Sequence, residues 1–188
     1  RDVGYRCSTG PLVWNRRAED LDARASASSV PVIWAADIDG GCLHRDRSRD
    51  RLRYLRVRPG DDRYLVSVVP AVLVQRTTAP EQARRLVAAE LTPQVLADWG
   101  GRVIIENHVN VLRPTAATPL LSRATLTRVL SSAPLDRVMR SISGSVAVSA
   151  YELESLPLPS ATTLADWDKL PGEELEAAIS ETYRGACS

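Results

Sequence analysis

Short apolar segments occupy the first two thirds of this chain, and segments with helical periodicity occupy the last third. Segments 31–36 and 71–76 are typical of buried strands, because each is a short apolar run beside turn-forming residues. Further strands are expected at 12–14, 53–58, 85–90 and 103–112. Helices are expected at 122–131, 135–141, 162–168 and 172–183, with Ser122 as an N-cap and Pro134 as a separator. This order predicts an α+β domain with a curved antiparallel or mixed β-sheet followed by several short helices.

The length of 188 residues is enough for one domain with a substantial core. There is no run of about 18 apolar residues, so no membrane span is expected. Three cysteines lie far apart, so we expect reduced thiols in a cytoplasmic protein. The polar start without Met or a signal peptide leads us to expect one part of a longer protein.

The net charge of +1 hides an uneven distribution. Residues 1–150 hold 22 Arg and 15 acidic residues, whereas residues 151–188 hold two basic and eight acidic residues. A basic body suits a polyanionic partner. We therefore expect an acidic, amphipathic tail over 161–188 that docks through Leu175, Ala178, Ile179 and Thr182 and points away from that partner.

Common catalytic signatures are absent from the sequence. It contains no Gly-x-Gly-x-x-Gly, P-loop, His-Glu-x-x-His or Gly-x-Ser-x-Gly motif. With only two histidines, a histidine-based metal site is not expected. The chain alone is therefore predicted to be non-catalytic and to hold no cofactor or metal.

Two arginine-rich segments are candidate nucleic-acid contacts. Residues 44–63 hold eight arginines, and Arg56 and Arg58 share one face of an expected strand, where they can contact phosphate or guanine. The alternative is a charged hairpin with internal ion pairs. Asn15, Arg16 and Arg17 follow Trp14 into a polar loop and can reach base edges. The alternative there is a core tryptophan with a capping Asn. Trp34 is expected in the core.

A third candidate follows a buried strand. Strand ends direct polar side chains into clefts, and the end at 75–78 carries Gln75, Arg76, Thr77 and Thr78. Gln reads adenine and Arg reads guanine or phosphate. Arg84 and Arg85 return to the same region if the next strand forms a hairpin. The alternative is a structural hydrogen-bond network.

Two further segments complete the candidate surface. On the strand expected at 103–112, Glu106, His108 and Asn110 share one face, which allows either a buried polar network or DNA contact by His108 and Asn110. Arg140 and the small residues Ser143 and Ser145 lie at a helix end, where free amides and hydroxyls suit phosphate. A glycine cap at Gly144 is compatible with that role.

Several of these segments, taken in order, resemble a known family. They are residues 11–16, 31–35, the Gln-Arg-Thr-Thr of 75–78, the Glu-Asn-His-Val-Asn of 106–110 and the stretch 142–159 that ends in Leu-Pro-Leu-Pro. The order resembles the target recognition domain of bacterial N6-adenine-specific DNA methyltransferases of the Eco57I-like and PstI/BsuBI-like groups. The ending is also similar to type I specificity subunits. The resemblance covers roughly residues 10–160.

The resemblance implies a module that reads double-stranded DNA. It would work beside an upstream catalytic domain of the same chain, which binds S-adenosylmethionine and transfers methyl to adenine N6. The Asn/Asp-Pro-Pro-Tyr/Phe signature of such catalytic domains is absent here, so methyl transfer is not assigned to these residues. A competing hypothesis is a protein-interaction or oligomerisation module without DNA contact. We expect the recognition domain at 1–160, with Leu153 and Leu156 buried and Glu152 and Glu154 exposed.

Overall fold

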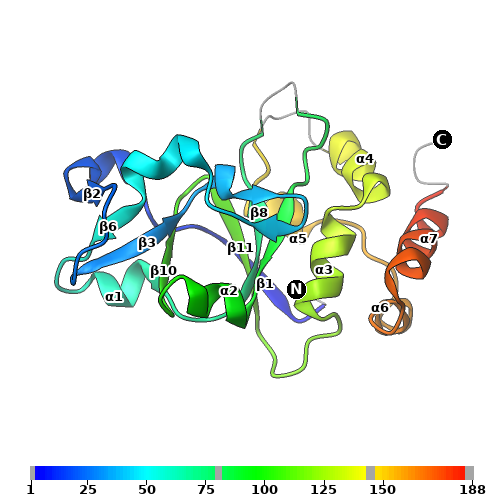
Figure 1. Cartoon of the computed structure of the whole chain (residues 1–188). Helices are drawn as coiled ribbons and strands as arrows, with labels where there is room; N and C mark the ends of the chain where they lie inside the picture. The colour runs from blue at the N-terminus through cyan, green and yellow to red at the C-terminus, as the bar shows by residue number, and fades with distance from the viewer. Residues whose placement is uncertain (1–2, 79–81, 143–146, 185–188) are drawn as a thin grey trace.

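A computed structural model describes residues 3–78, 82–142 and 147–184 of the chain. Two β-sheets lie next to each other, and a group of helices packs on the outer face of the first sheet (Figure 1). The predicted α+β class, with antiparallel and mixed sheets followed by short helices, is confirmed.

The first sheet is antiparallel and surrounds one fully buried strand. Its order is β1 (Tyr5–Thr9), β11 (Val109–Pro114), β8 (Ala71–Gln75) and β9 (Ala88–Leu91). Val72 and Val74 of β8 pack in the core beneath the helices, whereas Ala71 and Leu73 pack in the core on the opposite face. Burial on both faces explains why this strand is a continuous apolar run without alternation.

The second sheet is mixed. Its order is β2 (Leu21–Asp22), β6 (Tyr54–Arg56), β3 (Ser29–Ile33), β10 (Val103–Ile105) and β7 (Val66–Ser67). β3 and β10 are parallel, and the other pairs are antiparallel. A small hairpin of β4 (Ile38–Asp39) and β5 (Cys42–Leu43) lies against β9, with a bridge between Gly41 and Ala89.

The remaining elements are helical. The 3-10 segments are η1 (Trp14–Arg16), η2 (Ala18–Asp20), η3 (Ala35–Asp37) and η4 (Arg47–Leu52). The α-helices are α1 (Asp61–Tyr64), α2 (Pro93–Asp98), α3 (Arg123–Leu130), α4 (Ala133–Ile142), α5 (Ala150–Glu154), α6 (Ala161–Trp167) and α7 (Gly172–Thr182). None of those in the described ranges has the length and apolar character that a membrane span requires.

The prediction of one continuous strand over 103–112 is wrong. This stretch forms two strands, β10 and β11, which belong to different sheets and are separated by a turn at 106–108. Gly10 lies against this turn so closely that a Cβ there would be 2.2 Å from the Glu106 carbonyl oxygen. The Asn107 N–H donates to the Leu12 carbonyl at 2.9 Å. Leu12 forms an isolated β-bridge with Glu106, and Trp14 already belongs to the 3-10 segment η1. The strand predicted over 12–14 therefore does not form.

The predicted cap of α3 and the burial of Trp34 are confirmed, whereas the role predicted for Pro134 is wrong. Ser122 caps α3 by accepting from the Thr125 N–H, and Trp34 is buried, as predicted. Pro134 does not separate the two helices, because it lies in the first turn of α4, where its missing N–H is not needed.

The predicted burial of Leu153 and Leu156, at and just after α5, is confirmed. The predicted exposure of Glu152 and Glu154 is wrong, because both are half-buried. Glu152 completes a capping box with Ser149, and Glu154 accepts from the Cys7 N–H at 3.0 Å. Because β1 is an edge strand, its free N–H groups need such an acceptor.

The acidic tail packs on the body of the domain. Leu175 and Ile179 of α7 are buried in the cluster that contains Leu126 and Val129 of α3, which confirms the predicted docking of this helix. Ala178 packs against the same cluster, whereas Thr182 is exposed. α6 and α7 therefore share the core of residues 1–160.

Candidate functional site

Most predicted contact residues meet at the carboxyl end of β8. The Arg76 N–H donates to the His108 carbonyl at 2.7 Å, and Arg76 Nη1 donates to the Asn107 carbonyl at 3.2 Å. The Val148 N–H donates to the Arg76 carbonyl at 2.7 Å, and Asn110 Nδ2 donates to the Val148 carbonyl at 2.7 Å. Three segments far apart in sequence are thereby held together beside the Arg76 guanidinium.

Gln75 has a structural role at this strand end. Its Nε2 donates to the carbonyls of Ala35 at 3.0 Å and Ile38 at 2.9 Å, and its Oε1 accepts from Gln82 at 3.2 Å. Both amide hydrogens are therefore used, and base reading by Gln75 would require breaking a protein bond. Thr77 is exposed, whereas Thr78 is buried.

The turn at 106–108 presents His108 to solvent. Glu106 is 1% exposed and His108 is 48% exposed, and the two are joined by a contact of 2.7 Å between Oε1 and Nδ1. The second carboxylate oxygen accepts from the His108 N–H at 2.8 Å. The prediction that Glu106, His108 and Asn110 share a strand face is wrong, because only Asn110 lies on a strand and its side chain is buried. The carboxylate fixes the imidazole ring through Nδ1 and leaves Nε2 available.

A buried carboxylate on α4 holds the opposite side of the region. Asp136 Oδ1 accepts from the backbone N–H groups of Arg85 at 2.6 Å and Leu86 at 2.8 Å. Its Oδ2 accepts from Arg140 Nε at 2.8 Å, and Arg140 Nη2 donates to the Ala83 carbonyl at 2.9 Å. Asp136 therefore fixes the loop that precedes β9 and orients the Arg140 guanidinium.

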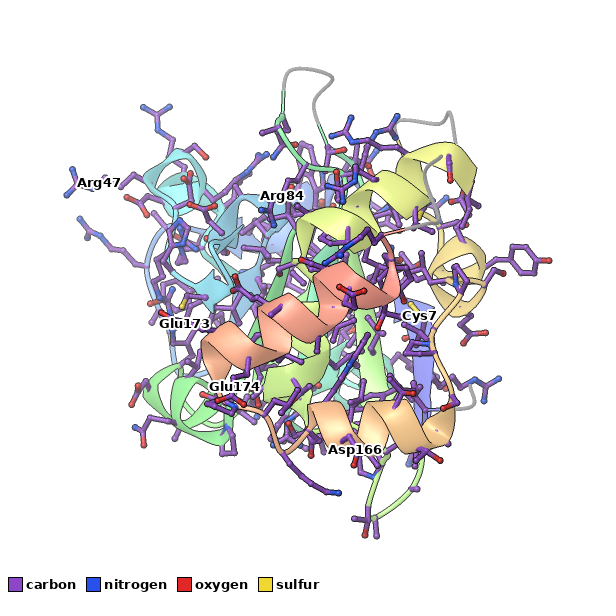
Figure 2. All side chains as sticks on the ribbon, turned by 90° about the vertical axis from the view of Figure 1, so that its right-hand side faces the viewer. Cys7, Arg47, Arg84, Asp166, Glu173 and Glu174 are labelled. Atoms are coloured by element: carbon purple, nitrogen blue, oxygen red, sulfur yellow. The ribbon has the colours of Figure 1, made fainter. Side chains whose placement is uncertain are left out.

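The side chains of Arg84 and Arg85 add charge to this loop. Arg84 is exposed and donates to the Ser131 carbonyl, and Figure 2 shows it at the upper side of the molecule. The Arg85 side chain has no hydrogen-bond or ion-pair partner within the described ranges. Ser143 and Ser145 lie outside the described residues.

An open groove of about 1210 Å³ lies next to this cluster. One wall comes from the β4–β5 hairpin and His44, and the other comes from Arg84 and the start of α4. Glu176 of α7 also lines the groove, and its carboxylate lies 3.8 Å from Arg128. Gln75 and Arg84 of the cluster therefore border a concave surface that is open to solvent and that also carries acidic residues, Asp39, Asp46, Glu90 and Glu176.

The other predicted contacts form a separate ion-pair network. Asp20, whose side chain is 3% exposed, lies 2.7 Å from Arg17, 3.1 Å from Arg56 and 2.5 Å from Arg58. Arg17 also binds Asp61 at 2.9 Å. Arg56 and Arg58 are therefore ion-paired, as in the alternative above, but their partners Asp20 and Glu19 lie outside 44–63 and the pairs are not internal to one hairpin. Figure 1 shows β2 and β6 at the end of the molecule away from α4. These arginines are not brought to the end of β8.

The predicted loop after Trp14 is the 3-10 segment η1, where Asn15 and Arg16 are exposed. Trp14 packs edge-to-face on Trp34, with ring centroids 6.2 Å apart. The side chains of Asn15 and Arg16 have no partner among the described residues. Their contact with DNA stays a prediction.

The arginines of this network lower the pKa values of the carboxyl groups that they pair with. Burial raises the pKa of Asp20, but hydrogen bonds from Arg17 and Arg56 outweigh it and the net pKa is below the ordinary 3.8. The hydrogen bond from Arg17 holds the pKa of Asp61 below 3.8. Because the folded values are depressed, the stabilisation is complete above the unfolded pKa and is lost as the pH falls through the folded values.

We expect Arg17→Ala to lower the free energy of unfolding by about 1–2 kcal/mol at pH 7, because it removes charge-assisted hydrogen bonds to two carboxylates. The further loss on acidification below about pH 4 should be smaller than in the wild type. Urea unfolding at several pH values measures both effects. Arg16→Ala is the matched control on the same segment, and equal acid dependence of Arg17→Ala and wild type would contradict the prediction.

Nucleophile or metal chemistry has little support in the described residues. No group of three or more metal-ligating side chains is found there. Burial raises the pKa of the Cys7 thiol to about 12, so this thiol is not an activated nucleophile.

The sequence interpretation missed the buried carboxylates Asp37, Asp20 and Asp136, which hold loops in place. Each acidic residue lies directly beside apolar residues, as in Pro134-Leu135-Asp136, but Asp20 also has the acidic neighbour Glu19, so the sequence gives only a weak signal. Such a residue is buried only when it is paired.

Comparisons with known proteins find similarity to methyltransferases. No family model matches the chain. The chain is 27% identical over 176 residues to type II methyltransferase M.BsuBI of Bacillus subtilis, which covers 93% of this chain and 35% of that protein. It is also 27% identical over 168 residues to type II methyltransferase M.PstI of Providencia stuartii, which covers 88% of this chain and 32% of that protein. The chain spans about a third of the length of these curated relatives and is similar to them over most of its own length.

Proposed function

We propose that the chain is the DNA target-recognition module of an adenine-N6 methyltransferase from a restriction–modification system. The observation that supports it most is the convergence of Arg76, Arg84, His108 and Arg140 around the end of β8. The similarity to type II methyltransferases extends over the segments that build this cluster.

The cluster has the chemistry that duplex DNA requires. Guanidinium groups bind phosphates and guanine edges, and an imidazole nitrogen can bind a base edge or a phosphate. The nearby carboxylates Glu106 and Asp136 are buried and bind protein groups, so their charge is not presented to a ligand. The module would position DNA for a catalytic domain elsewhere in the protein, which would bind S-adenosylmethionine.

The test is binding to DNA by the wild-type protein. A pool of random-sequence duplexes is selected on the protein and sequenced, and affinity for selected and random duplexes is measured over a range of salt concentrations. We expect an enriched sequence and a steep loss of affinity with salt, because phosphate contacts release counterions. A protein-interaction module would show neither. Calorimetry with S-adenosylmethionine should detect no binding to this chain.

We expect Arg76→Ala to weaken binding to the selected duplex by about 1–3 kcal/mol, because this guanidinium lies at the centre of the cluster. Arg24→Ala is the control, since Arg24 is exposed in a loop between β2 and β3. Fluorescence anisotropy with labelled duplex measures both variants. Equal affinities of the two variants would show that the end of β8 does not face DNA.

A further inference from the structure

A second basic element follows His44, which lines the groove. The segment 45–53, which contains η4, carries an arginine at every second position. Arg49 stacks over Trp34 with its guanidinium carbon 5.1 Å from the ring centroid. Arg45 stacks over Trp99 at 4.6 Å and over Tyr54 at 5.5 Å. Two of these arginines therefore turn inward and pack on the aromatic residues of the second sheet and α2.

A buried ion pair fixes both ends of η4. Arg53 Nη1 lies 3.0 Å from Asp37 Oδ1, with side chains 4% and 0% exposed. The same carboxylate oxygen accepts from the Asp46 N–H at 2.8 Å, and Asp46 is the N-cap residue of η4. Arg53 Nη2 donates to the Asp46 carbonyl at 2.5 Å. Asp37 and Arg53 thus hold the beginning and the end of η4 together as a rigid arch.

Arg47 and Arg51 are the arginines that this arch presents to solvent. Both are exposed, and neither has a hydrogen-bond or ion-pair partner in the described part of the chain. The acidic residues of the segment are engaged elsewhere, because Asp46 accepts from the Ser48 N–H and Asp50 pairs with Arg53 at 3.3 Å. The arch therefore carries two uncompensated positive charges on a fixed backbone, unlike Arg56 and Arg58 around Asp20.

We infer that Arg47 and Arg51 bind the phosphate backbone of duplex DNA, as a second contact besides the cluster at the end of β8. This inference rests on the proposed function. Figure 2 shows Arg47 extending outward at the left edge of the molecule, at about the height of Arg84, whereas Glu174 and Asp166 lie lower. A pre-ordered backbone loses little entropy on binding, and unpaired guanidiniums suit phosphate oxygens. Arg47 and Arg51 contribute affinity that does not depend on DNA sequence, in contrast to Arg76.

The test is the double variant Arg47→Ala and Arg51→Ala in the intact protein. Its affinity should fall by the same factor for the selected duplex and for random duplex, because phosphate contacts carry no sequence information. The slope of log affinity against log salt should become less steep by about 0.9 for each lost contact, or roughly 2 for both. The double variant with lysine at both positions should keep the wild-type slope, because it retains the charges.

Arg63→Ala is the matched control, since Arg63 is an exposed arginine without a partner in the described residues, and α1 lies on the lower side in Figure 1. Urea unfolding checks that all variants have the wild-type stability, which their exposure leads us to expect. An unchanged slope in the alanine variant, with wild-type DNA binding intact, would overturn the phosphate contact and leave the proposed function standing. Failure of the wild type to bind DNA would overturn the proposed function itself.

Discussion

Replacement of Asp37 by alanine is expected to lower the free energy of unfolding by about 3–5 kcal/mol, because it removes one partner of a buried ion pair. The Asp37 carboxylate accepts from Arg53 and from the N–H groups of Trp34 at 2.9 Å and Asp46 at 2.8 Å. Without it, the buried Arg53 guanidinium keeps only Asp50 as a carboxylate partner, and that side chain is 63% exposed. Urea unfolding at pH 7 measures the loss, which is a large part of the 5–15 kcal/mol that is typical of a domain.

Asp39→Ala is the control, because Asp39 is exposed on the neighbouring strand β4 and should change stability by less than about 0.5 kcal/mol. The double replacement Asp37→Leu with Arg53→Met should recover much of the loss, because no buried charge then remains unpaired. A loss of less than about 1 kcal/mol for Asp37→Ala would show that the ion pair does not support η4.

The elements that the sequence predicts best are those with a local signal. β3 and β8 are short apolar runs, and α3 begins at a serine N-cap, so each can be found from its own residues. The apolar positions Leu175 and Ile179 lie on one side of a helix and predict its docking surface. These features depend on periodicity and capping within a single segment.

The break between β10 and β11 has no such signal. Residues 103–105 and 109–112 are all buried, so the run is apolar on both sides of the turn. The turn is fixed by Gly10 and Leu12, which are distant in sequence, and by the Glu106 side chain that accepts the His108 N–H. A contact between remote segments therefore decides which sheet each half joins.

Contacts between remote segments also decide which arginines are ion-paired. Arg76, Arg84 and Arg140 are brought together because a strand end, a hairpin return and a helix converge. Arg56 and Arg58 were selected for their shared strand face, but the structure adds Asp20, a buried acid from another segment. Whether an arginine is free or paired depends on tertiary contacts, so composition alone does not distinguish Arg47 from Arg56.

Removal of residues 171–188 is expected to destabilise the protein strongly while leaving the salt dependence of DNA binding nearly unchanged. Leu175, Ile179 and Tyr183 are buried, and the Tyr183 hydroxyl donates to the Pro157 carbonyl at 2.7 Å. Truncation of a single buried Leu or Ile costs about 2–5 kcal/mol, so loss of the whole helix should exceed that range. Urea unfolding measures the stability, and DNA titrations of the folded protein at several salt concentrations measure the slope.

A charge variant separates packing from electrostatics in this helix. Replacement of Glu173, Glu174, Glu176 and Glu181 by glutamine keeps the buried residues and removes four negative charges. If DNA lies on the side that carries Arg47 and Arg84, the charges of Glu173, Glu174 and Glu181 are more remote from it and partly screened at physiological salt, where the screening length is about 8 Å. The variant should then bind DNA with nearly wild-type affinity. Glu176 is the most sensitive position, because it lines the groove and lies 3.8 Å from Arg128. A large gain in affinity from Glu176→Gln alone would show that DNA enters the groove as far as α7.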